Sequence, residues 1–128
     1  MSSHAFPIVL VVDDDRTQVA LLTAYLKSAG FRVISAPSGV AALAALKKAG
    51  EASKGISLLV TDLDMPGMNG RMFADEVRRQ HPGMKVLFVT SNTDELFRRG
   101  QLLGHGEAFL EKPVTRDLLR EAVNVLLQ

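Results

Sequence analysis

Acidic residues follow two of the apolar runs in this sequence, and this pattern points to a cation site. Residues 8–12 (IVLVV) are followed by Asp13, Asp14 and Asp15, and residues 57–61 (SLLVT) are followed by Asp62. Neighbouring carboxylates repel one another and are costly to remove from water, so they need a cation or a hydrogen-bonding role. Asp15 followed by Gln18 is typical of a helix N-cap. The other carboxylates form an oxygen-rich set that suits a hard divalent cation such as Mg²⁺.

Two further apolar runs end in residues that suit an anionic group. Residues 85–90 end in Thr90 and are followed by Ser91, and residues 108–111 are followed by Lys112 and Pro113. A hydroxyl and an ammonium beside a cation site are what phosphoryl transfer requires, because the charge on the transferring oxygens must be neutralised. Asp62 is the best candidate nucleophile, since a carboxylate can accept a phosphoryl group as an acyl phosphate.

The elements that must position these residues follow from the spacing of apolar side chains. Apolar runs occur at 8–12, 31–35, 57–61, 85–90 and 108–111, and helix-like periodicity occurs at 16–29, 38–49, 69–81, 93–103 and 115–127. Regular alternation predicts parallel strands joined by right-handed crossovers, with both faces of the sheet covered by helices. The expected fold is a doubly wound α/β sandwich of (βα)5 type, with ligands at the carboxyl ends of the strands. The polar stretch 47–55 is expected to be a helix end that runs into a surface loop.

Length and charge limit the remaining functions. The chain has 128 residues, which fits one domain, and its 15 basic and 14 acidic residues give a net charge of +1. This charge balance and the small number of aromatic residues argue against a nucleic-acid partner, and the basic pairs Arg78–Arg79 and Arg98–Arg99 are expected to be solvated. No secretory or membrane-spanning segment is recognisable, so we expect a cytoplasmic protein without a membrane partner.

Taken in order along the chain, these motifs resemble those of the receiver domain of two-component response regulators. The resemblance rests on the acidic pair after the first strand, TDLDMPGMNG at 61–70, Thr90 with Ser91, and Lys112 with Pro113. It covers residues 6–128 of a single domain, 1–128, and implies a flavodoxin-like strand order 2-1-3-4-5. It also implies that Asp62 is the phosphoacceptor and takes its phosphoryl group from a sensor histidine kinase or a histidine phosphotransfer protein. Such a protein is an acceptor and not a turnover enzyme acting on an external substrate.

The resemblance further implies a metal set. Asp14 and Asp62 would bind Mg²⁺, or alternatively Mn²⁺, together with the backbone carbonyl of Asp64, and Asp13 would act through a bound water. Lys112 would pair with the acceptor carboxylate and later with a phosphoryl oxygen. Its peptide bond to Pro113 is expected to be cis, a geometry that proline makes accessible.

A switch is implied as well. Thr90, with Ser91 beside it, would move its hydroxyl onto the phosphoryl group, and the ring of Phe109 would then turn inward. The surface that changes would comprise the fourth helix, the fifth strand and the fifth helix, where a downstream partner or a phosphorylation-dependent second copy of an otherwise monomeric chain would bind. The sequence departs from the pattern at His105, where a glycine is usual, and Phe109 lacks the hydroxyl of the common tyrosine.

Two alternatives stay open. Asp13-x-Asp15-x-Thr17 is similar to the first motif of haloacid-dehalogenase-type phosphatases, in which Asp13 would be the nucleophile and Asp15 the general acid. That family needs a further acidic motif after the lysine, and here only Asp117 and Glu121 follow, inside the last predicted helix. The other alternative is an interaction module that is never phosphorylated, although every acceptor-site position carries a suitable residue.

Overall fold

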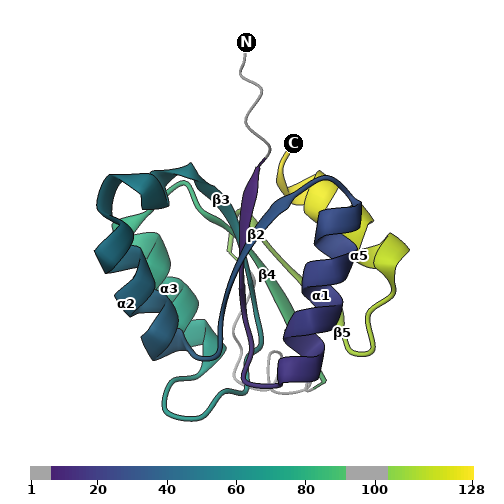
Figure 1. Cartoon of the computed structure of the whole chain (residues 1–128), viewed down its shortest axis with the longest axis horizontal. Coiled ribbons are helices and arrows are strands. Elements are labelled where there is room, and N and C mark those ends of the chain that lie inside the picture. The colour runs from purple at the N-terminus through teal and green to yellow at the C-terminus, as the bar shows by residue number, and fades with distance from the viewer. Residues whose placement is uncertain (1–6, 92–103) are drawn as a thin grey trace.

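A parallel β-sheet lies between two layers of helices in the computed structural model, which describes residues 7–91 and 104–128 (Figure 1). The strands are β1 (Ile8–Val12), β2 (Arg32–Ala36), β3 (Ile56–Thr61), β4 (Lys85–Thr90) and β5 (Glu107–Glu111). Their order is β2-β1-β3-β4-β5, and every neighbouring pair is parallel. This confirms the predicted α/β fold and its strand order.

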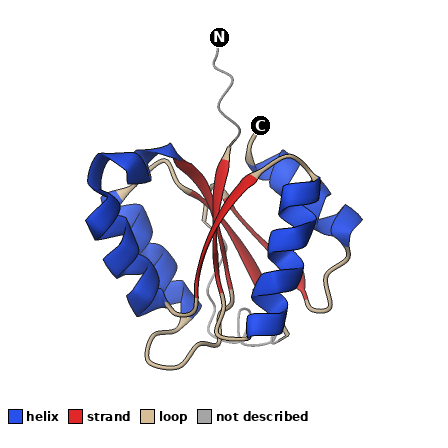
Figure 2. Cartoon of the chain, viewed as in Figure 1, coloured by secondary structure: helices blue, strands red, loops and turns tan. Residues whose placement is uncertain are grey.

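Helices cover both faces of the sheet (Figure 2). They are α1 (Arg16–Ser28), α2 (Gly39–Ala49), α3 (Gly70–Gln80) and α5 (Arg116–Leu126), with a short 3-10 helix, η1 (Gly50–Gly55), after α2. Helices α1 and α5 lie against one face, and α2 and α3 lie against the other (Figure 1). The helix predicted at 93–103 lies outside the described residues. None of the described helices is long and apolar enough to cross a bilayer.

The stretch 47–55, predicted as a helix end that runs into a surface loop, is a helix end followed by a 3-10 helix in place of the loop. Helix α2 continues to Ala49, and η1 then adds a further ordered turn in which the Ser53 hydroxyl donates to the Gly50 carbonyl at 2.7 Å. Ser53 is buried, so its hydroxyl needs this internal partner. A polar composition therefore concealed a packed 3-10 turn.

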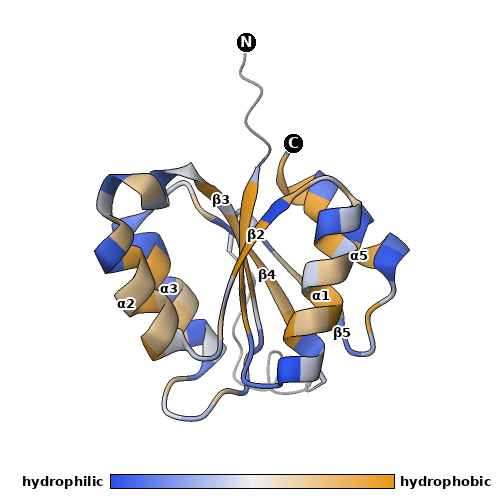
Figure 3. Ribbon diagram, viewed as in Figure 1, coloured by the Kyte–Doolittle hydropathy of each residue, from blue (hydrophilic) through white to orange (hydrophobic). Residues whose placement is uncertain are grey.

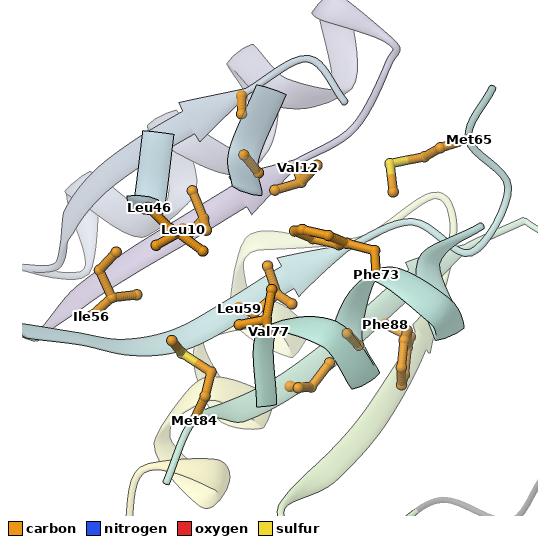
Figure 4. Packing of buried hydrophobic residues seen from close by; sticks show 14 of the residues in the cluster. Leu10, Val12, Leu46, Ile56, Leu59, Met65, Phe73, Val77, Met84 and Phe88 are labelled. Carbon is orange, nitrogen blue, oxygen red and sulfur yellow. The ribbon is translucent and has the colours of Figure 1, made fainter. Parts of the chain in front are cut away.

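Alternating side chains of the central strands build two cores, one on each face. Val9 and Val11 pack toward α1 and α5, whereas Leu10 and Val12 pack toward α2 and α3. Figure 3 shows the apolar strands at the centre, and Figure 4 shows Phe73 and Val77 of α3 packed among strand residues. Each such buried side chain contributes about 1.5–3 kcal/mol relative to leaving it exposed. Burial on both faces fixes the register of the strands and therefore the edge at which they all end.

Candidate functional site

Three carboxylates meet where β1 and β3 end. Asp13 and Asp14 follow β1, Asp62 follows β3, and one carboxylate oxygen from each lies within 4.8 Å of the other two. Asp13 and Asp62 are only 2% and 8% exposed, whereas Asp14 is exposed to solvent. Strand order reverses between β1 and β3, and ligands of doubly wound sheets bind at such a point. An all-oxygen set of this kind fits a hard divalent cation and leaves room for water on the Asp14 side.

Lys112 connects two of these carboxylates. Its Nζ donates to Asp13 Oδ2 at 2.9 Å and to Asp62 Oδ2 at 2.8 Å. Burial alone would lower the pKa of Lys112, but its hydrogen bonds to Asp62 and Asp13 outweigh that effect and raise the pKa above its usual value. The ammonium therefore stays charged at neutral pH. One positive charge faces three carboxylates, and the remaining negative charge favours a bound cation.

The position of Lys112 is fixed by its backbone. Its amide donates to the Thr90 carbonyl at 2.9 Å, which extends the pairing of β4 with β5 one residue past the end of β5. The Lys112–Pro113 peptide bond is cis, as the resemblance implied. The lysine side chain extends from the sheet edge to the carboxylates that follow β1 and β3.

The buried location of Asp13 disfavours the charged form of its carboxyl group. Burial raises the pKa of its carboxyl above the usual range, although the Asp15 amide, which donates to Asp13 Oδ1 at 2.9 Å, and Lys112 both oppose this rise. The charge of Asp62 adds a smaller upward effect. A buried carboxylate that is incompletely compensated by its protein partners is well suited to a cation nearby.

The loop that carries Asp62 is held at both ends. The amide of Asp64 donates to Asp62 Oδ1 at 3.1 Å, and the amide of Gly70 donates to the Leu63 carbonyl at 2.7 Å. A Cβ on Gly70 would clash with the Asp62 carbonyl oxygen and lie 2.8 Å from the Leu63 Cα, so only glycine fits there. Asn69 caps α3 by accepting from the Met72 amide at 2.8 Å. The sequence TDLDMPGMNG thus folds the loop back against the acceptor candidate.

The predicted switch residues occupy the neighbouring strands. Thr90 ends β4 and is fully buried, while Ser91 is exposed immediately after it. Phe109 is half-buried on β5, where its Cα is paired with that of Phe88 and its side chain packs against the α2–α3 core. The structure therefore places Thr90 and Lys112 at one sheet edge with the carboxylates, and Phe109 farther back along β5.

Asp15 has a separate task. Its carboxylate accepts from the amides of Thr17 at 2.9 Å and Gln18 at 3.3 Å, which confirms its prediction as the N-cap of α1. A carboxylate used in this way is not directed at a substrate beside Asp13. This geometry argues against the pairing of Asp13 with Asp15 that a phosphatase of the haloacid-dehalogenase type would need.

The sequence did not predict an ion cluster that joins α3 to β5. Arg71 and Arg78 of α3 both bind Glu107 of β5, and the side chain of Arg78 is only 24% exposed. The prediction of a solvated side chain was therefore wrong for Arg78, whereas Arg79 is exposed as predicted, and Arg98 and Arg99 lie outside the described residues. The available signal was a carboxylate, Glu107, directly before the apolar residues 108–110, because a carboxylate that is buried beside such a run requires a cationic partner.

Comparison with known proteins agrees with this geometry. The response regulator receiver domain family matches residues 9–124. A response regulator receiver domain protein from Clostridium thermocellum has a TM-score of 0.80 at 26% identity, covering 95% of this chain and 94% of that chain. TrrA, a response regulator protein from Thermotoga maritima solved in complex with Mg²⁺-BeF, has a TM-score of 0.77 at 26% identity, covering 95% of this chain and 100% of that one.

Curated relatives are longer than this chain. The sensor kinase CckA of Brucella abortus is 31% identical over 126 residues, which is 98% of this chain but 13% of the kinase. Across eight such relatives, the chain spans between 12% and 49% of their length. The family match extends over nearly all described residues and over both acidic strand ends. The chain belongs to the response regulator receiver domain family.

Proposed function

We propose that the chain accepts a phosphoryl group on Asp62 from a phosphohistidine of a histidine kinase or histidine phosphotransfer protein. The observation that carries this proposal is the shared lysine: Lys112 bridges Asp13 and Asp62 while Asp14 lies open beside them. A site that combines a carboxylate nucleophile, an ammonium and an oxygen-rich cation position has the parts required for phosphoryl transfer.

In the proposed reaction, an Asp62 carboxylate oxygen attacks phosphorus, a new O–P bond forms, and the P–N bond to the donor imidazole breaks. Asp13, Asp14 and Asp62, with the Asp64 carbonyl, would hold Mg²⁺ or Mn²⁺, which neutralises charge on the phosphoryl oxygens when bound. Lys112 already lies 2.8 Å from Asp62 and would pass from the carboxylate to a phosphoryl oxygen. The chain is thus an acceptor of the group and not a turnover enzyme on an external substrate.

The consequence we propose is a change of surface. Thr90 at the end of β4 would bind the phosphoryl group, Phe109 would turn inward, and the face formed by the fourth helix, β5 and α5 would change its affinity for a partner. Leu118 and Val125 of α5 are 52% and 62% exposed, and exposed apolar side chains on this face suit a protein partner. A downstream protein or a second phosphorylated copy would bind there, and we place this exchange in the cytoplasm.

Intact-mass spectrometry after incubation with a small acyl phosphate and Mg²⁺ tests the proposal. We expect one labile phosphoryl adduct on the natural chain, no adduct on Asp62→Asn, and slower labelling of Asp13→Asn. Asp15→Asn is the matched control, because asparagine also caps helices and labelling should persist. An adduct that survives Asp62→Asn, or hydrolysis of a phosphoester that depends on Asp13, would contradict the proposal.

A further inference from the structure

The Arg71–Arg78–Glu107 cluster joins α3 to the start of β5. The side chain of Glu107 is 2% exposed, and Arg71 binds it with Nη1 at 2.8 Å from Oε1 and Nη2 at 2.6 Å from Oε2. Arg78 Nη1 adds a bond to Oε2 at 2.9 Å, and the Gly104 amide donates to Oε1 at 2.6 Å. The hydrogen bonds from Arg71, opposed by burial, lower the pKa of Glu107 to about 2. Separating the partners of such a pair leaves a buried charge uncompensated. Movement of α3 away from β5 is therefore costly.

Arg71 of this cluster lies against β4, the neighbour of the strand that carries Phe109. The Arg71 guanidinium lies over the Phe88 ring at 5.0 Å from its centroid, and Phe88 is the register partner of Phe109. Glu107 and Phe109 are two residues apart on β5, so their side chains point to the same face of the sheet. Arg71 therefore sits on the face of β4 and β5 to which Phe109 belongs.

Arg71 also adjoins the loop that carries Asp62, which we call the acceptor loop. Arg71 directly follows Gly70, whose amide binds the Leu63 carbonyl at 2.7 Å and whose Cα lies against the Asp62 backbone. A displacement of the Asp62 backbone therefore has to displace the first turn of α3. The path from Asp62 through Leu63, Gly70 and Arg71 to Glu107 uses two peptide bonds and hydrogen bonds no longer than 2.8 Å.

We propose that Arg71 is a positioning residue that links the acceptor loop to β5, independently of the route through Thr90. This inference rests on the proposed phosphoacceptor function of Asp62. Because coupling between two sites is reciprocal, releasing Arg71 from Glu107 weakens binding of a phosphoryl group at Asp62 and reduces the response of β5 to that binding. Arg71 contacts neither the cation site nor the acceptor carboxylate among the described residues, so its effect is transmitted through the loop.

Titration with Mg²⁺ and beryllofluoride, followed by backbone amide NMR, tests this link on the full chain. We expect Arg71→Gln and Glu107→Gln each to weaken binding by about tenfold, and the double variant to be no weaker than the weaker single variant. The amide signals of Phe109 and Leu110 should also shift less at saturation than in the natural chain. Arg71→Lys keeps the charge but loses the bidentate hydrogen bonding to Glu107. Its affinity for beryllofluoride should fall between those of the natural chain and Arg71→Gln.

Arg79→Gln is the control, since Arg79 lies on the same helix and pairs with Glu76 at the surface. It should bind beryllofluoride as the natural chain does. Equal affinity and equal β5 shifts in Arg71→Gln and the natural chain would overturn the link, even if Arg71→Gln lowered the unfolding midpoint. Absence of binding by the natural chain would instead contradict the proposed function itself.

Discussion

Lys112 is the residue on which the charge balance of the site depends. Its ammonium is shared between Asp13 and Asp62, so each carboxylate has only part of a counter-charge and Asp14 has none from this lysine. The unfolded chain separates these carboxylates, and folding brings them together. A cation at the site should therefore stabilise the folded chain, because it binds the assembled carboxylates and not the dispersed ones.

Asp62→Asn should stabilise the cation-free protein and remove its response to Mg²⁺. The substitution relieves repulsion with Asp13 and Asp14 and leaves Lys112 paired with Asp13, so we expect a gain of about 1 kcal/mol in the free energy of unfolding. Urea unfolding with and without Mg²⁺ measures both effects. An unchanged or lower midpoint for Asp62→Asn without metal, or an undiminished Mg²⁺ effect, would contradict the assigned charge balance.

At the scale of elements, strands and helices were predictable and their long-range contacts were not. Continuous apolar runs placed β1, β3 and β4 within a residue of their observed ends, because burial on both faces of the sheet leaves a strong signal. The six-residue η1 was missed, since so short a 3-10 helix has no apolar periodicity to detect. The contact of Arg71 with Glu107 spans 36 residues of sequence, and no local pattern encodes such a partner.

The close approach of α3 to the acceptor loop predicts a large effect at Gly70. Gly70→Ala places a methyl group against the backbone of Asp62 and Leu63, so the helix start or the loop must move. We expect a loss of about 2–4 kcal/mol in the free energy of unfolding together with slower phosphorylation. Gly83→Ala is the control, because no heavy atom lies within 4 Å of its added Cβ. Similar stabilities for the two variants, measured by urea unfolding, would refute the close packing.

At the scale of the whole molecule, topology creates the site from residues far apart in sequence. Parallel strands all end at one edge, and the order β2-β1-β3-β4-β5 brings Asp13, Asp62, Thr90 and Lys112 to that edge. The candidate site was therefore predictable once the alternation of strands and helices was recognised. The sharing of Lys112 between Asp13 and Asp62 was not, because it depends on side-chain distances.

Global stability should fall in acid partly through Glu107. Its pKa of about 2 in the folded chain lies below the ordinary value of 4.5, so its contribution is complete above about pH 5 and is lost as the pH falls toward 2. A shift of this size corresponds to roughly 3 kcal/mol. Asp13 acts in the opposite sense, because its raised pKa makes its contribution decline as the pH rises through the folded value.

Glu107→Gln isolates the contribution of the Glu107 charge to the loss of stability in acid. The variant should be less stable than the natural chain at pH 7, and the difference should shrink steadily between pH 5 and pH 2. Urea unfolding of both proteins across this range gives the difference directly. A difference independent of pH would mean that Glu107 acts through packing rather than through its charge.

The measurement that bears most directly on the central claim is the chemical identity of the phosphorylated residue. Borohydride reduces an acyl phosphate on aspartate to homoserine, so treatment of the phosphorylated chain followed by peptide mass spectrometry marks the acceptor. We predict homoserine at position 62 in the natural chain and none in a sample incubated without phosphoryl donor. Homoserine at position 13, or a stable phosphoester on a hydroxyl such as that of Thr90, would contradict Asp62 as the acceptor.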